Sequence, residues 1–272
     1  MTPAPVFQRY RDPDLRELAH RNETLEVLLS HRSVRSFTSD PIDTATIETI
    51  VAAAQSAPTS SNLQAWSVVA VRDPERKARI ATLAGDQAFI AQAPVFLVFL
   101  ADLGRVRRLA ERRGVPSEGA DYLDSTLLGA IDAALAAQNA VVAAESLGWG
   151  TVYVGAVRNA PEEISDELDL PPAAFPVFGL SVGRSAVATD GTGPGIKPRL
   201  PLASVLHHDV YDAETADSGI DVYDERLGEY NREQGRTTAW TTAVLARLRD
   251  TTSLKGCDTI RDSLSARGLL SK

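Results

Sequence analysis

The sequence predicts a layered fold of helices and strands, of the α/β or α+β class. Two observations support this prediction. Helical patterns outnumber strand patterns along the 272 residues, and most of the strands alternate with helices. One strand pattern, over residues 94–100, is apolar without interruption. Such a run is typical of a strand that is covered on both faces.

The composition is that of an ordinary soluble globular protein with a sizeable core, since 44% of residues are hydrophobic and 24% are charged. The net charge of -8 argues against a nucleic-acid binder, which would show a basic excess. The single cysteine, Cys257, excludes an internal disulfide and favours a reducing compartment. Residues 1–10 show no apolar signal-peptide core, and the run 95–101 is too short to span a membrane. We therefore expect a cytoplasmic protein with no nucleic-acid or membrane partner.

Residues 1–20 are polar and contain three prolines, so we expect an arm there, with one helical turn, and a single domain over residues 21–272. Asn22 is a suitable N-cap for a short helix with leucines on one face. Asp43 is a suitable N-cap for a second helix, which ends before Pro58.

A strand over residues 66–71 and a helix over 74–83 precede the apolar strand. Residues 105–113 are expected to be charged and mostly exposed, followed by a loop. The longest helical pattern covers residues 122–147, and Gly148 is a suitable C′ cap. Large apolar residues recur in it at helical spacing, and alanines occupy several faces. We interpret it as a central helix whose alanine-rich surface packs against several neighbours.

Further strands are predicted over residues 151–155 and 177–182, with a short helix between them that begins at Pro161. A loop rich in glycine and proline follows over residues 183–199. Two helices over residues 221–232 and 239–249, and a last helical fragment over 260–264, complete the chain.

Several motifs suggest a site but do not satisfy its chemistry. Residues 191–197 resemble a phosphate loop, but Pro198 stands where a magnesium-binding Ser or Thr is needed. Residues 148–150 begin like a dinucleotide fingerprint, but Tyr153 occupies the position of its third glycine. The four histidines form no zinc motif with each other or with cysteine, so no metal site is expected, and no GxSxG elbow occurs.

Residues 31–35 hold two guanidiniums, an imidazole and a hydroxyl within the stretch HRSVR. Guanidiniums form paired, charge-assisted hydrogen bonds with phosphate oxygens, and a hydroxyl with loop N–H groups can complete such a cradle. The alternative is a solvated basic turn at the end of a helix, where cations suit the helix dipole. Taken alone, this stretch favours the solvated turn.

Five segments in order reverse that preference: HRSVR, PTSSNLQ, GDQ before the apolar strand, ESLGWGTVYVGAVRN and GIKPRLP. Together they resemble the oxygen-insensitive, NADPH-dependent nitroreductase and flavin reductase branch of the FMN-dependent nitroreductase superfamily, over residues 31–240. The resemblance implies an α+β homodimer with a central mixed, mostly antiparallel sheet wrapped by helices. Two FMN molecules would bind at the subunit interface, the long helix over residues 122–147 would form the centre of that interface, and residues 205–255 would form a mobile helical excursion.

The resemblance also implies a set of flavin-binding residues and no catalytic side chain, because N5 of FMN carries the hydride. The phosphate and ribityl chain would be held by the first segment, at His31, Arg32, Ser33, Val34 and Arg35. The ring would contact Thr59 and Ser61 across the dimer, Gln87, and backbone groups of Tyr153, Val154, Gly155 and Ala156. Lys197 and Arg199 would place charge near the phosphate and the N1–O2 side of the flavin, and Pro198 between them would also line the flavin site.

Two departures from the family pattern affect these expectations. Ala156 stands where the family has a second glycine, and its Cβ restricts the backbone. The arginine that the family associates with the NADPH 2′-phosphate is replaced by Gln234, which is flanked by Arg232 and Arg236. These two arginines are the candidates for contacting NADPH.

The implied function is hydride transfer from NADPH through FMN to nitroaromatics, quinones, azo dyes, chromate or free flavin, in a ping-pong scheme. A non-catalytic FMN-binding protein for storage or sensing is the main alternative. A helical interaction module that uses the arginines for protein contacts is a third reading.

Overall fold

The computed structural model describes residues 5–15, 17–187 and 195–269. The chain forms two compact units. The first, here called the helical unit, consists of residues 1–32 and 188–254. The second, the sheet unit, consists of residues 33–187 and 255–272.

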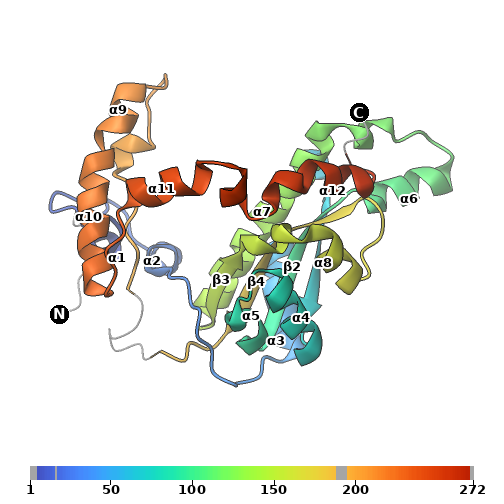
Figure 1. Cartoon of the computed structure of the whole chain (residues 1–272), viewed down its shortest axis with the longest axis horizontal. Helices are drawn as coiled ribbons and strands as arrows, with labels where there is room; N and C mark the ends of the chain where they lie inside the picture. Colours follow the sequence, from blue (N-terminus) through green and yellow to red (C-terminus); the bar gives the residue numbers. More distant parts are fainter. Residues whose placement is uncertain (1–4, 16, 188–194, 270–272) are drawn as a thin grey trace. The chain divides into compact units, whose positions relative to one another are not determined.

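The sheet unit is built on four strands in the order β1-β2-β4-β3 (Figure 1). They are β1 (Trp66–Val71), β2 (Val95–Asp102), β3 (Gly150–Val154) and β4 (Ala174–Gly183). All three strand pairs are antiparallel, and the described residues add parallel pairing only as an isolated bridge between Ser33 and Thr151. The expected α+β fold with a mostly antiparallel sheet is confirmed.

Helices cover both faces of this sheet. One face is covered by α3 (Thr44–Gln55) and α7 (Leu123–Ser146), and the other by α4 (Pro74–Leu83), α5 (Ala88–Gln92) and α8 (Pro161–Glu167). Alternate residues of β2 serve the two cores: Leu97 and Phe99 pack on the α3 and α7 side, Phe96 and Val98 on the other. The uninterrupted apolar strand is therefore explained by burial on both faces.

The long helix α7 buries its small side chains and exposes its large ones. Its buried alanines are Ala133, Ala136, Ala137, Ala140 and Ala144, each of them 0% exposed. Its large exposed apolar residues are spaced four apart and include Leu127 at 50% and Ile131 at 53%. Small side chains let α3 and the sheet approach closely, as at Gly129, where an added Cβ would lie 3.0 Å from the Ala101 Cβ. The expected central helix, whose alanine-rich surface packs against several neighbours, is confirmed, because that surface lies in the core against α3 and the sheet.

By length and composition alone, α7 is the one helix among the described residues that could cross a membrane. The candidate run predicted from the sequence, residues 95–101, lies instead in the strand β2. A core helix passes the same test, and α7 packs against α3 and all four strands of the sheet.

The rest of the sheet unit comprises α6 (Gly104–Arg113), the 3₁₀ helices η1 (Ser60–Asn62), η2 (Glu118–Asp121), η3 (Gly155–Asn159) and η6 (Cys257–Thr259), and α12 (Ile260–Ala266). The stretch expected to be charged is the helix α6, and its Ala110 is buried. The guanidinium of Arg267, directly after α12, donates to the carbonyls of Ala174 at 2.7 Å and Leu170 at 2.7 Å. These bonds attach the end of the chain to the sheet unit.

The helical unit contains α1 (Pro5–Tyr10), α2 (Glu23–Ser30), η4 (Leu202–Ser204), α9 (Ala213–Ser218), α10 (Ile220–Glu233), α11 (Trp240–Leu248) and η5 (Thr251–Leu254). Tyr223, Leu227 and Tyr230 of α10 form its small core. The Asp224 carboxylate accepts hydrogen bonds from the backbone N–H groups of Trp240, at 2.6 Å, and Thr241, at 3.1 Å. Asp224 thereby caps α11, and its bond with the Thr241 hydroxyl lowers its pKa.

We expected a boundary between an arm and the domain at residue 20, but the structure places residues 1–32 together in the helical unit. Contacts within that unit hold the N-terminal residues. Arg11 donates to Glu233 at 2.7 Å, and Arg226 pairs with Asp12 at 3.0 Å. Long-range ion pairs of this kind leave no local signal in the sequence. Residues 205–255 are largely helical, as expected of the excursion, and its mobility stays a prediction.

Candidate functional site

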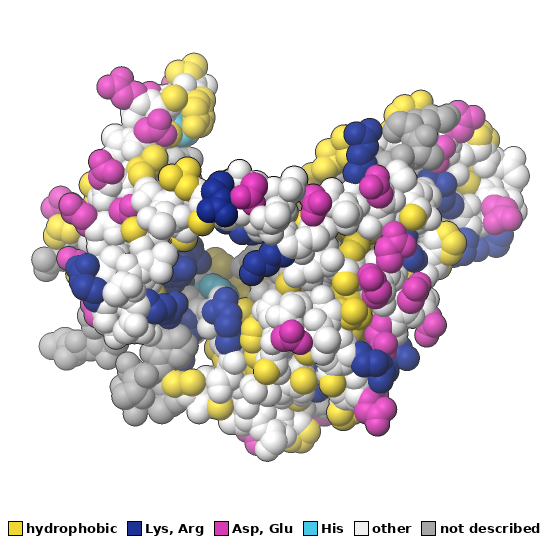
Figure 2. Space-filling model, viewed as in Figure 1, with side chains coloured by type: hydrophobic (Ala, Val, Ile, Leu, Met, Phe, Trp, Pro, Cys, Tyr) yellow, Lys and Arg dark blue, Asp and Glu magenta, His cyan; other side chains and the backbone are white. Residues whose placement is uncertain are grey.

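Most charged side chains on the face shown in Figure 2 are interspersed by sign. Many are paired, for example Arg79 of α4 with Glu167 of α8 at 2.9 Å. By contrast, the guanidiniums of Arg32 and Arg35 make no hydrogen bond or ion pair with any residue that the structure describes. Two cations that lie three positions apart in the sequence, and that have no carboxylate partner among the described residues, are the kind of groups that an anion site requires.

The segment after Arg32 lies beside β3 and is not a free turn. The Val34 N–H donates to the Thr151 carbonyl at 2.9 Å, and Ser33 forms the bridge to Thr151. The Val34 side chain is buried and sits over Gly150, where an added Cβ would lie 2.7 Å from Val34 Cγ2. Of Val34, therefore, only the backbone is available to a ligand, while its side chain anchors the exposed Arg35.

The same strand ends at the second predicted segment. The Tyr153 ring packs edge-on against Phe178, with centroids 5.3 Å apart, and its hydroxyl donates to Gln138 at 3.4 Å. Burial, with a smaller contribution from the Glu145 carboxylate, raises the pKa of the Tyr153 phenol. After the buried Val154 come Gly155, which is exposed, and Ala156, which is half-buried.

Neither Gly155 nor Ala156 has a positive φ. Alanine at position 156 is therefore compatible with the backbone of this turn. The restriction expected from its Cβ has no consequence for the local fold, because an L side chain adopts such a conformation readily.

Gln87 lies in a tight turn that approaches η3. Gly85 and Asp86 both have positive φ, at +78° and 56°, and the Gln87 side chain donates to the Ala84 carbonyl at 3.0 Å. A Cβ added at Gly85 would lie 3.6 Å from Asn159 Nδ2. The sheet unit therefore brings the Gln87 turn next to the 3₁₀ turn that Gly155 begins.

The loop that carries Thr59 and Ser61 has an unusual backbone. Ser61, Asn62 and Gln64 adopt left-handed conformations, with φ of 49°, 54° and 49°. Left-handed conformations of residues other than glycine persist only where surrounding contacts impose them. The Thr59 hydroxyl accepts one such contact, from the Gln64 N–H at 3.3 Å.

Asp132 of α7 supplies two further contacts to this loop, and it was not among the residues predicted from the sequence. The carboxylate is 1% exposed and accepts backbone hydrogen bonds from Ser60 and Ala65, each at 3.1 Å. Its two oxygens thus hold both ends of the loop. One signal was available, namely a single carboxylate within the alanine-rich face of a helix.

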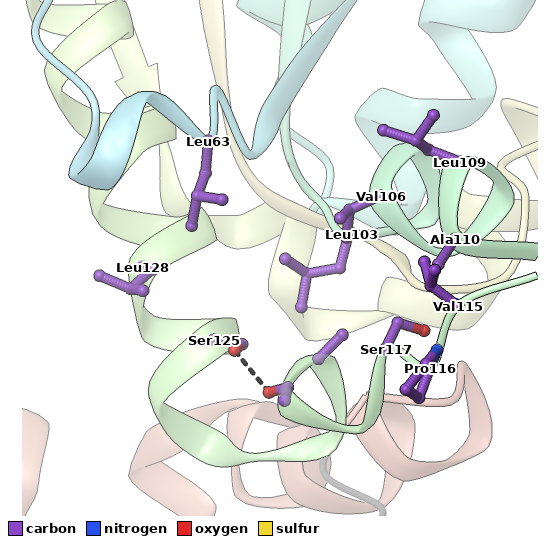
Figure 3. A pocket seen from close by; sticks show the side chains of 12 residues that line it. Leu63, Leu103, Val106, Leu109, Ala110, Val115, Pro116, Ser117, Ser125 and Leu128 are labelled. Atoms are coloured by element: carbon purple, nitrogen blue, oxygen red, sulfur yellow. Dashed lines mark hydrogen bonds between the residues drawn. The ribbon is translucent and has the colours of Figure 1, made fainter. Parts of the chain in front are cut away.

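Two pockets flank this loop. The polar one, of about 490 Å³, is lined by Thr59, Asn62, Gln64 and Arg105, among others. The apolar one, of about 340 Å³, has Leu63 and Leu128 on one side and Val106 and Leu109 of α6 on the other (Figure 3). Thr59 is the only predicted site residue among their lining residues.

The helical unit holds the remaining predicted flavin residues. Lys197 and Arg199 are exposed, while Pro198 is buried and its carbonyl accepts from the Tyr223 hydroxyl at 3.1 Å. The Arg9 guanidinium donates to the Lys197 carbonyl at 2.9 Å and to the His31 carbonyl at 2.6 Å. Arg9 therefore links the segment of His31 to the segment of Lys197, a role that no local pattern predicts.

The candidate NADPH residues lie in the last turn of α10, at Arg232, and in the turn that follows it, at Arg236. The Arg236 N–H donates to the Asn231 carbonyl at 2.7 Å, and the Asn231 side chain donates to the Thr238 carbonyl at 2.7 Å. Both Arg232 and Arg236 are exposed, and neither makes an ion pair with a described residue. They are free to contact an anionic group.

The sequence model of the nitroreductase family matches residues 28–184. The chain belongs to the nitroreductase family. A second model, of the C-terminal domain of that family, matches residues 197–272. The predicted flavin residues fall within these two ranges, and Arg9 lies before both.

Relatives within the nitroreductase family support this assignment along most of the chain. An FMN reductase (NADPH) of Bacillus subtilis is 40% identical over 230 residues, covering 82% of this chain and 90% of the relative. An oxygen-insensitive NADPH nitroreductase of Salmonella typhimurium is 39% identical over 215 residues, covering 79% and 85%.

Solved structures confirm the nitroreductase fold. The hypothetical oxidoreductase YcnD from Bacillus subtilis superposes with a TM-score of 0.86 at 38% identity, covering 92% of this chain and 98% of the other. The NADPH:FMN oxidoreductase from Vibrio harveyi, complexed with NAD+, gives a TM-score of 0.80 at 34% identity, covering 92% and 100%. The predicted family and fold class are therefore confirmed.

Proposed function

We propose that this nitroreductase-family protein is an FMN-dependent oxidoreductase that takes hydride from NADPH and reduces small-molecule acceptors. One observation carries the proposal: the unpaired guanidiniums of Arg32 and Arg35 flank a segment held on β3, the strand that ends directly before Gly155. The relatives named as an FMN reductase (NADPH) and an NADPH nitroreductase support both cofactors. A cytoplasmic location is part of the proposal.

The residues present fit FMN. A phosphate dianion requires more than one cation, which Arg32 and Arg35 supply, with His31 and the Ser33 hydroxyl as further donors. The backbone of Val34 and the backbone groups of Tyr153, Val154, Gly155 and Ala156 would face the ring, together with the side chains of Thr59, Ser61 and Gln87. Lys197 and Arg199, with Pro198 between them, would bring positive charge toward N1. When bound, FMN supplies a hydride acceptor at N5, and charge near N1 stabilises its reduced form.

The chain itself supplies position and electrostatics. A tyrosine phenol is protonated at neutral pH, and burial raises the pKa of Tyr153 further, so this side chain does not act as a base there. The bond from its hydroxyl to Gln138 orients the ring at the end of β3. No side chain is assigned to proton transfer in this proposal.

NADPH and the acceptor would use the same site in turn, in a ping-pong scheme. Nitroaromatics, quinones, azo dyes, chromate and free flavin are the proposed acceptors. Purified, flavin-loaded protein should oxidise NADPH steadily when a quinone is added, with parallel lines in double-reciprocal plots. Retention of FMN without any turnover, over a panel of these acceptors, would support the alternative of a storage or sensor protein.

We expect a homodimer that covers the exposed stripe of α7. Leu123, Leu127, Ile131 and Leu135 are between 41% and 53% exposed, and their spacing places them on one face of the helix. Obligate dimers bury more than about 2,000 Å² in an interface, and such a stripe is a suitable centre for one. Sedimentation should show a dimer at micromolar concentration.

The variant Leu127→Glu/Ile131→Glu should shift this equilibrium toward monomer, because the charges would be buried without partners. Thr82→Glu is the matched control, since Thr82 is exposed on α4, which covers the other face of the sheet. A wild-type monomer that is folded and flavin-loaded would contradict the proposed dimer.

NADPH should be preferred over NADH, but less strongly than in a relative with arginine in place of Gln234. A glutamine cannot supply the charge-assisted, bidentate contact that recognises a 2′-phosphate. Arg232 and Arg236 are exposed at the same turn and can replace it. The measurement is the ratio of kcat/KM for NADPH over NADH in wild type, Arg232→Ala and Arg236→Ala.

A charge-assisted contact of this kind contributes about 1.5–3 kcal/mol. Loss of the arginine that makes it should therefore lower the ratio of kcat/KM values by roughly 10- to 100-fold. Nearly equal use of both nucleotides by wild type would mean that both arginines lie in solvent. A strong preference that survives the double substitution would place the 2′-phosphate elsewhere, with Lys197 as the next residue to test. Arg158 is a weaker alternative, because its guanidinium already donates to the Val177 carbonyl at 2.5 Å.

A further inference from the structure

The N-terminal arm places a buried cation against two segments that carry proposed flavin residues. Arg9 of α1 is 6% exposed. Its Nη2 donates to the carbonyls of Leu29 at 3.0 Å and His31 at 2.6 Å, and its Nη1 donates to the carbonyl of Lys197 at 2.9 Å. The backbone of Arg9 contacts the second segment as well, since the Arg199 N–H donates to the Arg9 carbonyl at 2.8 Å.

These contacts set the spacing between two cationic segments. The first runs through His31 directly into Arg32, and the second holds Lys197 and Arg199 on either side of Pro198. One planar guanidinium that binds a carbonyl of each segment restricts their separation to a few ångströms at that point. A phosphate site gains affinity when its cations are held in place before the ligand arrives, because less ordering is required on binding.

Arg9 also corrects an unfavourable electrostatic feature of this site. The segment of His31 follows the C-terminal end of α2, where unpaired carbonyls present partial negative charge. Such an end is a poor neighbour for a phosphate. The Arg9 guanidinium binds the Leu29 carbonyl in that last turn, and a bound cation offsets the dipole there.

The arm has attachments that do not involve Arg9. Arg11 donates to Glu233 at 2.7 Å and stacks over the Tyr230 ring at 5.3 Å from its centroid. Asp12 pairs with Arg226 at 3.0 Å. The contacts of Arg11 and Asp12 therefore attach the arm independently of the hydrogen bonds that Arg9 donates to the three carbonyls.

We propose that Arg9 is a positioning residue for the phosphate end of the flavin, acting through the carbonyls of His31 and Lys197. The proposal rests on the proposed FMN-dependent function. It assigns a role in cofactor affinity to the arm, which lies before both ranges that match the family.

The test compares FMN with riboflavin, which has the same ring and ribityl chain but no phosphate. Flavin-free apoprotein is prepared from wild type, Arg9→Gln, Arg9→Lys and the control Arg11→Gln. Titration with each flavin then gives the dissociation constants of FMN and of riboflavin. Arg9→Gln should bind FMN about 10- to 100-fold more weakly, the range expected for losing charge-assisted bonds, with riboflavin affinity unchanged. Arg9→Lys keeps the positive charge but lacks the planar set of N–H donors of a guanidinium. It should therefore show a smaller loss of affinity, which is also confined to FMN. Arg11→Gln should keep the wild-type ratio.

An equal loss of affinity for FMN and riboflavin would overturn the proposal, because it would show only a general structural defect. Unchanged FMN affinity in Arg9→Gln would overturn it as well. If Arg9→Gln does not fold, the FMN-to-riboflavin ratio of Arg9→Lys decides in the same way. Failure of the proposed function looks different, since wild type itself would then not bind FMN.

Discussion

Arg35→Ala should lose most of its bound FMN. Arg35 is exposed, has no carboxylate partner among the described residues, and follows Val34, which is anchored on β3. Removing it deprives a bound phosphate of a bidentate partner worth about 1.5–3 kcal/mol. The dissociation constant of FMN should rise by roughly one to two orders of magnitude. Riboflavin binding should stay near its wild-type value, because only the phosphate contact is removed.

The measurement is flavin content after extensive dialysis, followed by titration of the apoprotein. Arg113→Ala is the matched control, an exposed arginine at the end of α6 in the same sheet unit. If Arg35→Ala keeps FMN at wild-type occupancy, the phosphate assignment is wrong.

Asp132→Asn should destabilise the protein and weaken flavin binding through a different route. The buried carboxylate accepts from the N–H groups of Ser60 and Ala65, and an asparagine can accept from only one of them while its amide group faces the other. A buried donor without a partner costs about 1–3 kcal/mol, so a loss of that size in the free energy of unfolding is expected. The left-handed residues of the loop lose the contact that fixes them.

The flavin signature should differ from that of Arg35→Ala. Because the loop carries Thr59 and Ser61, which are proposed to contact the ring, FMN and riboflavin should weaken together. Urea unfolding and the two flavin titrations measure these effects. Asp124→Asn, an exposed position in the first turn of the same helix, should change neither quantity. Wild-type stability of Asp132→Asn would show that the two backbone bonds do not hold the loop.

Local features of the fold were determined by sequence alone. Asn22 and Asp43 cap α2 and α3 as predicted, accepting from Leu25 and Thr46 at 2.9 and 2.6 Å. The predicted bounds of β1 and α4 match the structure. These features depend on residues within one turn or one strand, so a short stretch of chain specifies them. The family also followed from sequence, because its five segments keep their order along the chain.

Only the tertiary structure decided which side of α7 is buried. Both its alanine face and its leucine face are apolar, so hydrophobic periodicity cannot distinguish them. The alanines face inward because α3 and the sheet approach closely there, and this distance depends on elements far away in the chain. The same reason explains why the expected arm became part of the helical unit.

The roles of Asp132 and Arg9 also required the tertiary structure. Each binds backbone groups that are distant in sequence: Asp132 reaches Ser60 across 72 positions, and Arg9 reaches Lys197 across 188. Backbone N–H and C=O groups are the same in every residue other than proline, so such partners leave no mark in the amino-acid pattern. The sequence therefore predicted the side chains proposed to face the flavin, whereas folding determined the residues that hold their segments in place.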